Sequence, residues 1–354
     1  MDDGEIRRQL ENRNVRYRKE LEDYLRTWII DGYRERADAA FARDYSSADA
    51  YEKSVEPNRA RWREILGPPD LRAVGDLEAE PFEPLADIGG LWLRLPLNDA
   101  SGYGSLRAEA AFAAPAGASG PVPLVICQHG IGSSPERTFG LDDKTNVYKS
   151  YARRLVEAGF AVLSPFNLFG SPERGRIERL AKMAGMSMPG IELARVQRLL
   201  DAVLARSEID GNRVGLWGIS LGGLATQFWT PLEPRIKAAV SCAWFNRRLE
   251  KMIVQDPRYS CFLETPEAHA FIKCWLCEFD DVELCSLICP RPFLIQCGKA
   301  DNIAWWPWVM ETFEALKVHY DKLGLGDRVA IDLHELGHEI RVDSGVEWMK
   351  RWLG

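Results

Sequence analysis

The chain has 354 residues, of which 46% are hydrophobic and 27% are charged, a balance typical of a soluble globular protein with a sizeable core. Its formal net charge of −7 disfavours a polyanionic partner such as nucleic acid, because like charges repel. No stretch reaches the roughly 18 consecutive apolar residues of a membrane span, and the polar N-terminus lacks the apolar core of a secretory signal. We therefore expect a cytoplasmic protein that binds neither nucleic acid nor membrane.

The first 85 residues are predicted to form a helical accessory segment that carries no catalytic motif. A second helical stretch covers residues 47–66 and ends at Gly67-Pro68-Pro69. We expect the segment to pack on the main domain, to cap its site in part, or to mediate assembly of a homo-oligomer. The first helix is predicted to end at Asp31-Gly32, and its apolar residues repeat with helical spacing at Leu21, Tyr24, Leu25, Trp28 and Ile29.

Residues 86–354 alternate between strand-like and helical stretches and are predicted to form the catalytic domain. Nearly continuous apolar strands that alternate with helices indicate an α/β fold, with a mostly parallel sheet covered on both faces. Residues 246–285 interrupt the alternation and are predicted to form a lid insertion. Strands are predicted at residues 91–97, 106–113, 122–128, 161–165, 213–218, 236–244, 292–297 and 328–334. Helices are predicted at 143–158, 191–206, 221–229, 305–323 and 343–353, with a long loop at 168–189.

Four of the eight cysteines form a C-x2-C-x7-C-x3-C cluster, made of Cys274, Cys277, Cys285 and Cys289. Such a cluster can hold zinc or form two disulfides. However, the spacing between its halves is short for a zinc ribbon, and Cys285 and Cys289 fall on an apolar helical face. Reduced cysteines also fit a cytosolic chain better, so we expect neither a metal nor another cofactor.

The strongest motif is Gly218-Ile219-Ser220-Leu221-Gly222, which lies between a predicted strand and a predicted helix. A G-x-S-x-G sequence in this context is typical of a nucleophile elbow, in which a serine sits on a sharp, strained turn. Glycines suit this turn because side chains at positions 218 and 222 would collide with neighbouring backbone. We therefore predict that Ser220 is the nucleophile. The alternative is a glycine-rich helix start with an N-capping serine.

A second motif, His129-Gly130-Ile131-Gly132-Ser133, follows the strand predicted at 122–128. In an acyl-transfer enzyme a loop at this place turns backbone N–H groups toward the developing oxyanion. We assign the two donors to the amides of Ile131 and Leu221, with Gly132 as the alternative to Ile131. His129 itself is expected to support the loop rather than to act as a base.

A serine hydroxyl needs a base within hydrogen-bond reach. Among the other four histidines, His338 is favoured because it follows Gly337 just beyond the last predicted strand, where a loop can place an imidazole over the sheet edge. His334 lies at the end of that strand, so we expect it to be packed. His269 and His319 fall in predicted helices without a companion motif.

The acid of a triad should lie on a loop after a strand, between serine and histidine in the chain. Asp301 meets this requirement, since it follows the strand predicted at 292–297. There it would hold His338 in the right tautomer and stabilise the imidazolium. Asp332 is the alternative, although its place within a strand favours a structural role. The order Ser220, Asp301, His338 agrees with the order expected of the α/β-hydrolase fold.

Together, the elbow, the HGxG loop, the aspartate after a strand and the Gly-His pair resemble the α/β-hydrolase superfamily over roughly residues 88–354. The run Cys289-Pro290-Arg291-Pro292, followed by a strand, Gly298 and Asp301, is similar to the acetyl-xylan-esterase and dienelactone-hydrolase-related branch. That branch usually has a small residue where this chain has Cys289. Dienelactone hydrolases proper use a cysteine nucleophile, so their specific reaction is not implied. The resemblance implies the α/β-hydrolase fold and serine esterase activity.

Several tryptophans fall near the predicted site. Trp244 ends the strand predicted at 236–244, and Trp305, Trp306 and Trp308 follow Asp301. Aromatic rings beside an active site can stack on a sugar or an aromatic ester. The alternative is that these rings pack the helix against the sheet or the lid. The candidate substrate-binding residues are Gly132, Trp244, Trp305 and Trp306.

These observations predict a serine esterase that forms an acyl-enzyme intermediate. The expected substrates are small acyl or acetyl esters, with acetylated sugars among them, and the expected partner is a small molecule. Two alternatives stay open, because a fold does not determine a function. One is a C–C bond hydrolase or lyase that uses the same triad on a ketone-bearing aromatic substrate, and the other is a non-catalytic binding protein.

Overall fold

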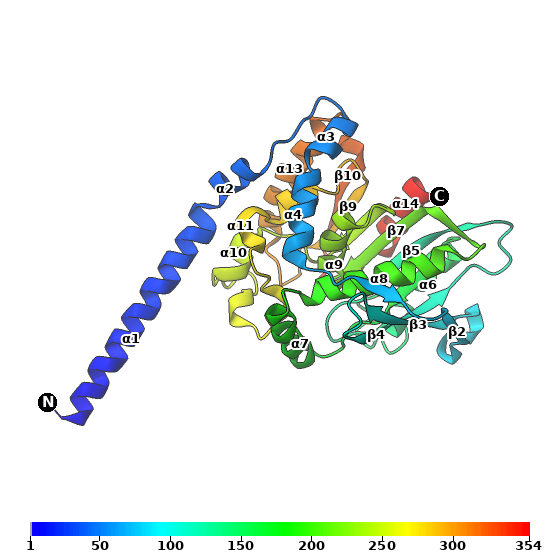
Figure 1. Ribbon diagram of the computed structural model, residues 1–354. Coiled ribbons are helices and arrows are strands. Elements are labelled where there is room, and N and C mark those ends of the chain that lie inside the picture. The colour runs from blue at the N-terminus through cyan, green and yellow to red at the C-terminus, as the bar shows by residue number, and fades with distance from the viewer. Residues whose placement is uncertain (1) are drawn as a thin grey trace.

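The computed structural model describes residues 2–354 and contains one ten-stranded sheet with helices on both of its faces (Figure 1). The strand order is β1-β3-β4-β6-β5-β7-β8-β9-β10, and β2 pairs with β3 beside β1. From β6 to β10 neighbouring strands run parallel, whereas β1 to β4 are antiparallel additions at one edge. The strands are β1 (Leu71–Ala73), β2 (Glu78–Pro81), β3 (Leu91–Asp99), β4 (Ser105–Ala113), β5 (Val122–Gln128), β6 (Ala161–Pro165), β7 (Ile209–Ile219), β8 (Ile236–Cys242), β9 (Phe293–Gly298) and β10 (Val329–His334).

The helices divide between the two faces of the sheet and an N-terminal arm. Helices α8, α9 and α13 cover one face, and α6 and α14 cover the other. The helices are α1 (Asp3–Arg26), α2 (Tyr33–Ala40), α3 (Ala48–Ser54), α4 (Glu56–Leu66), α5 (Pro135–Thr138), α6 (Tyr151–Glu157), α7 (Ser171–Met183), α8 (Met188–Leu204), α9 (Leu221–Trp229), α10 (Arg248–Ile253), α11 (Trp275–Glu278), α12 (Asp281–Ser286), α13 (Trp306–Asp321) and α14 (Val342–Leu353). No helix within residues 2–354 is both long enough and apolar enough to cross a membrane.

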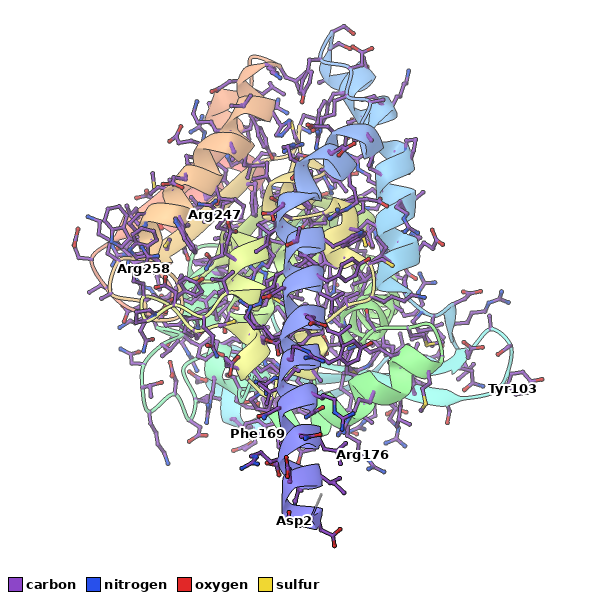
Figure 2. All side chains as sticks on the ribbon, turned by 90° about the vertical axis from the view of Figure 1, so that its left-hand side faces the viewer. Asp2, Tyr103, Phe169, Arg176, Arg247 and Arg258 are labelled. Carbon is purple, nitrogen blue, oxygen red and sulfur yellow. The ribbon has the colours of Figure 1, made fainter. Side chains whose placement is uncertain are left out.

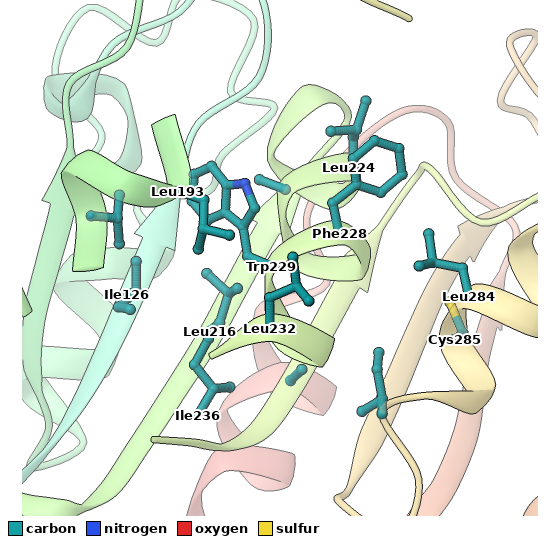
Figure 3. Packing of buried hydrophobic residues seen from close by; sticks show 14 of the residues in the cluster. Ile126, Leu193, Leu216, Leu224, Phe228, Trp229, Leu232, Ile236, Leu284 and Cys285 are labelled. Carbon is teal, nitrogen blue, oxygen red and sulfur yellow. The ribbon is translucent and has the colours of Figure 1, made fainter. Parts of the chain in front are cut away.

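The central strands supply residues to both cores, because successive side chains of a strand point to opposite faces of the sheet. In β7, Leu216 packs into the core under α8 and α9, whereas Trp217 packs into the core under α6 and α14. Figure 3 shows the first of these cores, in which Leu193 of α8 and Phe228 of α9 lie over β5 and β7. The prediction of an α/β-hydrolase fold with a mostly parallel, doubly covered sheet is therefore confirmed.

Two predictions of local structure between β5 and β7 are wrong. The helix predicted over 143–158 begins only at Tyr151, because the Asp143 carboxylate accepts from the amides of Val147 and Tyr148 and holds that stretch as a loop. The loop predicted over 168–189 contains α7 instead. Two buried polar contacts stabilise this polar helix, an Arg174–Glu192 ion pair and a Glu178 carboxylate that accepts from the Met188 amide.

The N-terminal segment contains more than the two predicted helical stretches. Short strands β1 and β2 extend the sheet edge, and the mostly exposed side chains of both strands explain why no alternating pattern marks them. Helix α4 packs over α9, where the Trp62 indole N–H donates to the Phe228 carbonyl at 3.0 Å. The Tyr51 hydroxyl likewise donates to the Ser286 carbonyl at 2.9 Å. The segment from α2 onward is thus part of the packed body, while α1 projects away from it (Figure 1).

Candidate active site

Ser220 occupies the sharp turn between β7 and α9. Its backbone has φ 58° and ψ −118°, a strained conformation that non-glycine residues rarely adopt. The flanking glycines are required by close approach. A Cβ at Gly218 would lie 2.1 Å from the Gly222 carbonyl oxygen, and one at Gly222 would lie 2.1 Å from the Gln128 oxygen. The turn therefore has the geometry of a nucleophile elbow.

His338 and Asp301 lie on the loops that follow β10 and β9, and they form a direct hydrogen bond. The distance from His338 Nδ1 to Asp301 Oδ2 is 2.7 Å. The other carboxylate oxygen accepts from the Ile303 amide at 2.9 Å, which orients the carboxylate. The Asp301 side chain is 2% exposed and the His338 side chain 25%, so the carboxylate is buried and the imidazole is partly open to solvent. No hydrogen bond between His338 and Ser220 is present among residues 2–354, and His338 is not among the lining residues of the cavity beside Ser220.

Backbone contacts hold these two loops together. The Lys299 amide donates to the His334 carbonyl at 2.7 Å, and the Ala300 amide donates to the Leu336 carbonyl at 3.1 Å. Gly298 permits this approach, because a Cβ there would lie 2.3 Å from the Gly337 oxygen. The carboxyl ends of parallel strands meet at one edge of a sheet, which brings these loops to the same edge as the elbow.

The loop after β5 brings Ile131 to a small cavity that is also lined by Ser220 and Leu221. The Leu221 amide lies in the first turn of α9 and has no intrahelical acceptor. Among residues 2–354, no backbone acceptor for the Ile131 amide is present. By contrast, the Gly132 amide donates to the Phe169 carbonyl at 3.0 Å, so it is not free to bind an oxyanion. The geometry favours Ile131 over Gly132 as the second donor.

His129 supports this loop, as the sequence predicts. Its ring is 1% exposed, its Nδ1 lies 2.8 Å from the Gly130 carbonyl, and its Nε2 accepts from the Asn167 amide at 3.3 Å. Burial lowers the pKa of His129 to about 4. A ring held between two backbone groups is not free to act as a base.

The other histidines lie in different surroundings. His334 is buried, and burial lowers its pKa. His319 is buried in α13, where its Nδ1 lies 2.7 Å from the Tyr45 hydroxyl. His269 is not in a regular α-helix as expected: it lies in a 3-10 turn, Ala268–Ala270, and lines the cavity beside Ser220. Burial lowers the pKa of His269 to about 3.

The cavity beside Ser220 has a volume of about 110 Å³, and most of its wall comes from residues 243–269, which follow β8. Its lining combines aromatic rings with charged and polar groups. It consists of Ile131, Ser220, Leu221, Ala243, Trp244, Asn246, Arg248, Lys251, Ser260, Phe262, Thr265, Glu267, His269, Ile303 and Ala304.

Arg248 is the most constrained charge in this wall. Its side chain is 1% exposed and forms a two-pronged ion pair with Asp281, with both N···O distances at 2.8 Å. It also donates to the Trp244 carbonyl. Within the described chain neither Arg248 Nη1 nor Trp244 Nε1 has a hydrogen-bond partner, although both are buried. Two residues of the cavity wall therefore each carry one buried donor that is unpaired within the described chain.

Lys251 lies in the same wall and is held by oxygen atoms only. Its Nζ donates to Ser260 Oγ at 2.7 Å and to the Ile303 carbonyl at 2.6 Å, and it also contacts the Ser260 carbonyl. Burial lowers the pKa of Lys251 to about 7.

The predicted substrate-binding tryptophans are not brought together. Trp244 lines the cavity, but Trp305 and Trp306 are not among its lining residues. Trp305 packs against Trp308, with ring centroids 5.2 Å apart, and the Arg258 guanidinium lies 3.9 Å from the Trp305 ring. Trp305 therefore fits the alternative that these rings serve packing, since its neighbours are other side chains of the surface.

Sequence reasoning missed the polar residues of the insertion. The available signal was a run of charges at residues 247–251, which is equally typical of a solvated helix face.

The four clustered cysteines are free: Cys285 and Cys289 are buried, whereas Cys274 and Cys277 are partly exposed. Burial raises the pKa of Cys289 to about 12 and that of Cys277 to about 11.

Comparison with known proteins gives two related sequences from Bacillus subtilis (strain 168). The chain is 26% identical over 261 residues to "Putative hydrolase YtaP", a match that covers 71% of this chain and 85% of that protein. It is 27% identical over 207 residues to "Putative esterase YitV", covering 57% of this chain and 77% of that protein. No protein-family model matches the chain.

Solved structures of esterases share its architecture. A protein described as a "putative acetyl xylan esterase" from Bacteroides fragilis aligns with a TM-score of 0.64 at 17% identity, covering 89% of this chain and 85% of that one. A glucuronoyl esterase from Sporotrichum thermophile aligns with a TM-score of 0.58 at 16% identity, covering 89% and 88%. At these identities the likeness is one of fold.

Proposed function

We propose that this chain, which has the α/β-hydrolase fold, hydrolyses carboxylic esters with Ser220 as nucleophile, His338 as base and Asp301 as the acid that orients it. One observation carries the proposal: a serine on a strained elbow and a 2.7 Å His338–Asp301 hydrogen bond lie on loops at one edge of the sheet. Strain of this kind persists only where the surrounding structure enforces it. The similarity to a hydrolase and an esterase supports the same reaction class.

The reaction proceeds through an acyl-enzyme intermediate. Ser220 Oγ attacks the ester carbonyl carbon while His338 Nε2 takes its proton, and Asp301 stabilises the imidazolium through Nδ1. The amides of Ile131 and Leu221 bind the oxyanion, and a donor of this kind typically contributes about 10²–10³ in kcat. His338 then protonates the leaving alkoxide. In the second half, His338 takes a proton from water, which attacks the acyl carbon. The bond from the acyl carbon to Ser220 Oγ then breaks, His338 gives the proton to Oγ, and the acid is released.

The substrate class that we propose is a small acyl ester of a polyhydroxylated alcohol, such as an acetylated sugar. The cavity of about 110 Å³ suits a short acyl group. Its wall includes Arg248 and Trp244, each with one buried donor that is unpaired within the described chain, the carboxylate of Glu267 as an acceptor, and the rings of Trp244 and Phe262. A buried donor left without a partner costs about 1–3 kcal/mol, so a substrate with matching hydroxyl groups is favoured over an alkyl ester.

The test is active-site labelling with turnover of p-nitrophenyl acetate. The wild-type protein should release p-nitrophenol in a burst, and a fluorophosphonate should modify the peptide that contains Ser220. Ser220→Ala should lose both, with a fall in kcat of about 10⁴–10⁶. Ser101→Ala, which removes an exposed serine of the β3–β4 turn, is the matched control and should behave as wild type. A Ser220→Ala protein with more than a few per cent of wild-type kcat would falsify the nucleophile assignment.

A further inference from the structure

Helix α1 is a long helix whose apolar side chains have no partner within the described chain. It has 24 residues, none of them buried, and it extends away from the body (Figure 1). Figure 2, viewed toward this side, shows α1 in front of the molecule with Asp2 at its free end. The exposed fractions of its large apolar side chains, together with that of Trp28 just beyond it, run from 40% to 65%: Ile6, Leu10, Val15, Tyr17, Leu21, Tyr24, Leu25 and Trp28.

The base of the arm is anchored, so α1 is held out from the body rather than folded onto it. Helix α2 follows α1 after one π-helical turn at Thr27–Asp31. The Tyr33 hydroxyl donates to the Glu283 carboxylate at 2.9 Å, and Arg36 Nε donates to the Cys277 carbonyl at 3.1 Å. An apolar stripe of this length in water calls for a partner outside the chain.

Five of these eight side chains follow the heptad pattern of a coiled coil, whereas Ile6, Val15 and Leu25 lie outside its a and d positions. Leu10, Tyr17 and Tyr24 repeat every seven residues at the d position, and Leu21 and Trp28 repeat at the a position. Asn14 occupies the a position before Leu21. A buried asparagine at an a position is a feature that sets the register of a helix pair. The first d and a positions of the seam hold the charged residues Asp3 and Arg7. The seam is therefore built for another helix with a defined alignment.

We propose that α1 pairs with α1 of a second copy of this chain as an antiparallel coiled coil. In an antiparallel pair, each a residue faces a d residue of the partner. We align the two helices so that the numbers of two facing residues add to 31. Leu10 then faces Leu21 of the second copy, and Asn14 faces Tyr17. In the outer layers Arg7 faces Tyr24 and Asp3 faces Trp28, so neither charged residue meets its own copy. The overlap runs from Asp3 to Trp28, which is the whole of α1 and the turn residue that continues its stripe.

Charge complementarity selects this pairing. The e and g positions flank the seam. In an antiparallel pair, each g residue meets a g residue of the partner, and each e residue meets an e residue. Arg13 then meets Glu20 of the second copy, Glu11 meets Arg18, and symmetry repeats both contacts. All four charged contacts are attractive, and none is repulsive.

A parallel pair of the same helices would be repelled. There the g position of one helix meets the following e position of the other, which places Arg13 against Arg18 twice. Identical residues also face each other across the seam, so Arg7 meets Arg7 and Asp3 meets Asp3. The charges that flank the seam of α1 are therefore complementary in an antiparallel pair and not in a parallel pair.

The antiparallel arrangement also suits the shape of the chain. At 1.5 Å per residue, α1 is about 36 Å long. The two bodies would lie at opposite ends of this rod, and each partner's N-terminus would reach the first helix turns next to the other body. Both candidate active sites stay open, because no residue of α1 lines the cavity beside Ser220.

The first test is the mass of the full-length protein in solution, measured by light scattering and sedimentation over a range of concentrations. We expect twice the chain mass of 40.0 kDa. Leu21→Lys, which places a charge in the seam, should give the single-chain mass with unchanged far-ultraviolet circular dichroism. Val15→Lys, on the opposite side of α1 at a b position, is the control and should keep the double mass. A monomeric wild-type protein, or a Leu21→Lys protein that stays dimeric, would overturn the proposal.

The second test determines the direction of pairing. Arg13→Glu turns two attractive contacts into repulsive ones in an antiparallel pair and should weaken the dimer roughly ten-fold. The double variant Arg13→Glu/Glu20→Arg restores opposite charges and should recover the wild-type dissociation constant. In a parallel pair Arg13→Glu would instead face Arg18 and tighten the dimer, an outcome that contradicts the antiparallel arrangement.

Discussion

Asp301 and Asp332 lie on neighbouring segments of the sheet edge, but their surroundings differ. Asp301 lies on a loop, is buried, and receives hydrogen bonds from His338 and from the Ile303 amide. Asp332 lies within β10, where it accepts from the Ser344 hydroxyl. A carboxylate bonded to Nδ1 of the base fixes its tautomer, whereas one bonded to a helix serine fixes local packing.

We therefore expect Asp301→Asn to lower kcat by about 10⁴ with little change in KM, because the imidazole would lose its correct tautomer. Asp332→Asn is the matched variant and should keep most of the activity. Steady-state kinetics on p-nitrophenyl acetate measure both. A greater loss of activity in Asp332→Asn than in Asp301→Asn would show that Asp332, and not Asp301, is the acid.

A second prediction at this scale concerns substrate choice. Arg248→Lys keeps a positive charge beside Asp281 but removes the unpaired Nη1 donor of a residue that lines the cavity. Loss of one charged hydrogen bond should raise KM for an acetylated sugar by roughly 10-fold or more, with p-nitrophenyl acetate little affected. Arg247→Lys, whose side chain is 45% exposed, is the control. Equal effects of Arg248→Lys on both esters would argue against a polar alcohol.

At the scale of elements, the N-terminal segment divides into two parts with different roles. Helix α1 buries nothing within its own chain, whereas α3 and α4 contribute Tyr51, Trp62 and Leu66 to the main core. Gly67 in a left-handed conformation ends α4 and leads the chain to β1. This change in packing falls between α1 and α2, within the segment predicted to span residues 1–85.

Two truncations test this division. Removal of residues 1–31 should leave a folded protein with unchanged turnover of p-nitrophenyl acetate, because no buried side chain is lost. Removal of residues 1–80 should prevent folding, since deletion of one large buried aromatic alone costs about 3–5 kcal/mol. Circular dichroism and urea denaturation distinguish the two. A cooperative unfolding transition in the shorter protein would show that α3 and α4 are dispensable.

At the scale of the whole molecule, burial of uncharged histidines couples folding to pH. Burial lowers the pKa of His319 and of His269 to about 3, and that of His129 to about 4. In the unfolded chain these rings bind protons near pH 6.5. The unfolded state therefore holds more protons below that pH, and stability falls as pH drops from 6.5 toward the folded pKa values.

His319→Gln tests this coupling without touching the candidate active site. One titrating ring contributes a slope of about 1.4 kcal/mol per pH unit below its unfolded pKa. Between pH 7 and pH 5.5 the variant should thus lose about 1 kcal/mol less unfolding free energy than wild type. Urea denaturation at both pH values supplies the comparison. Equal losses in the two proteins would mean that folding does not lower the pKa of His319.

The sequence by itself determined the features that depend on local chemistry. The glycines at 218 and 222 and the order of strand, serine and helix specify a sharp turn, and the structure has that turn. The alternation of apolar strands and helices specified the doubly covered sheet. The loop positions of Asp301 and His338 followed from strand ends, and their catalytic roles stay predictions.

Only the tertiary structure decided the features that depend on contacts distant in sequence. Helix α7 has a polar sequence, and its ion pair to α8 cannot be read from local periodicity. The insertion after β8 has no repeating pattern, so packing alone turns Arg248 and Lys251 toward the cavity. The amides of Ile131 and Gly132 look alike in sequence, and they differ because the Phe169 carbonyl accepts from only one of them. A local motif encodes a turn, but the choice among equivalent polar groups belongs to the packed chain.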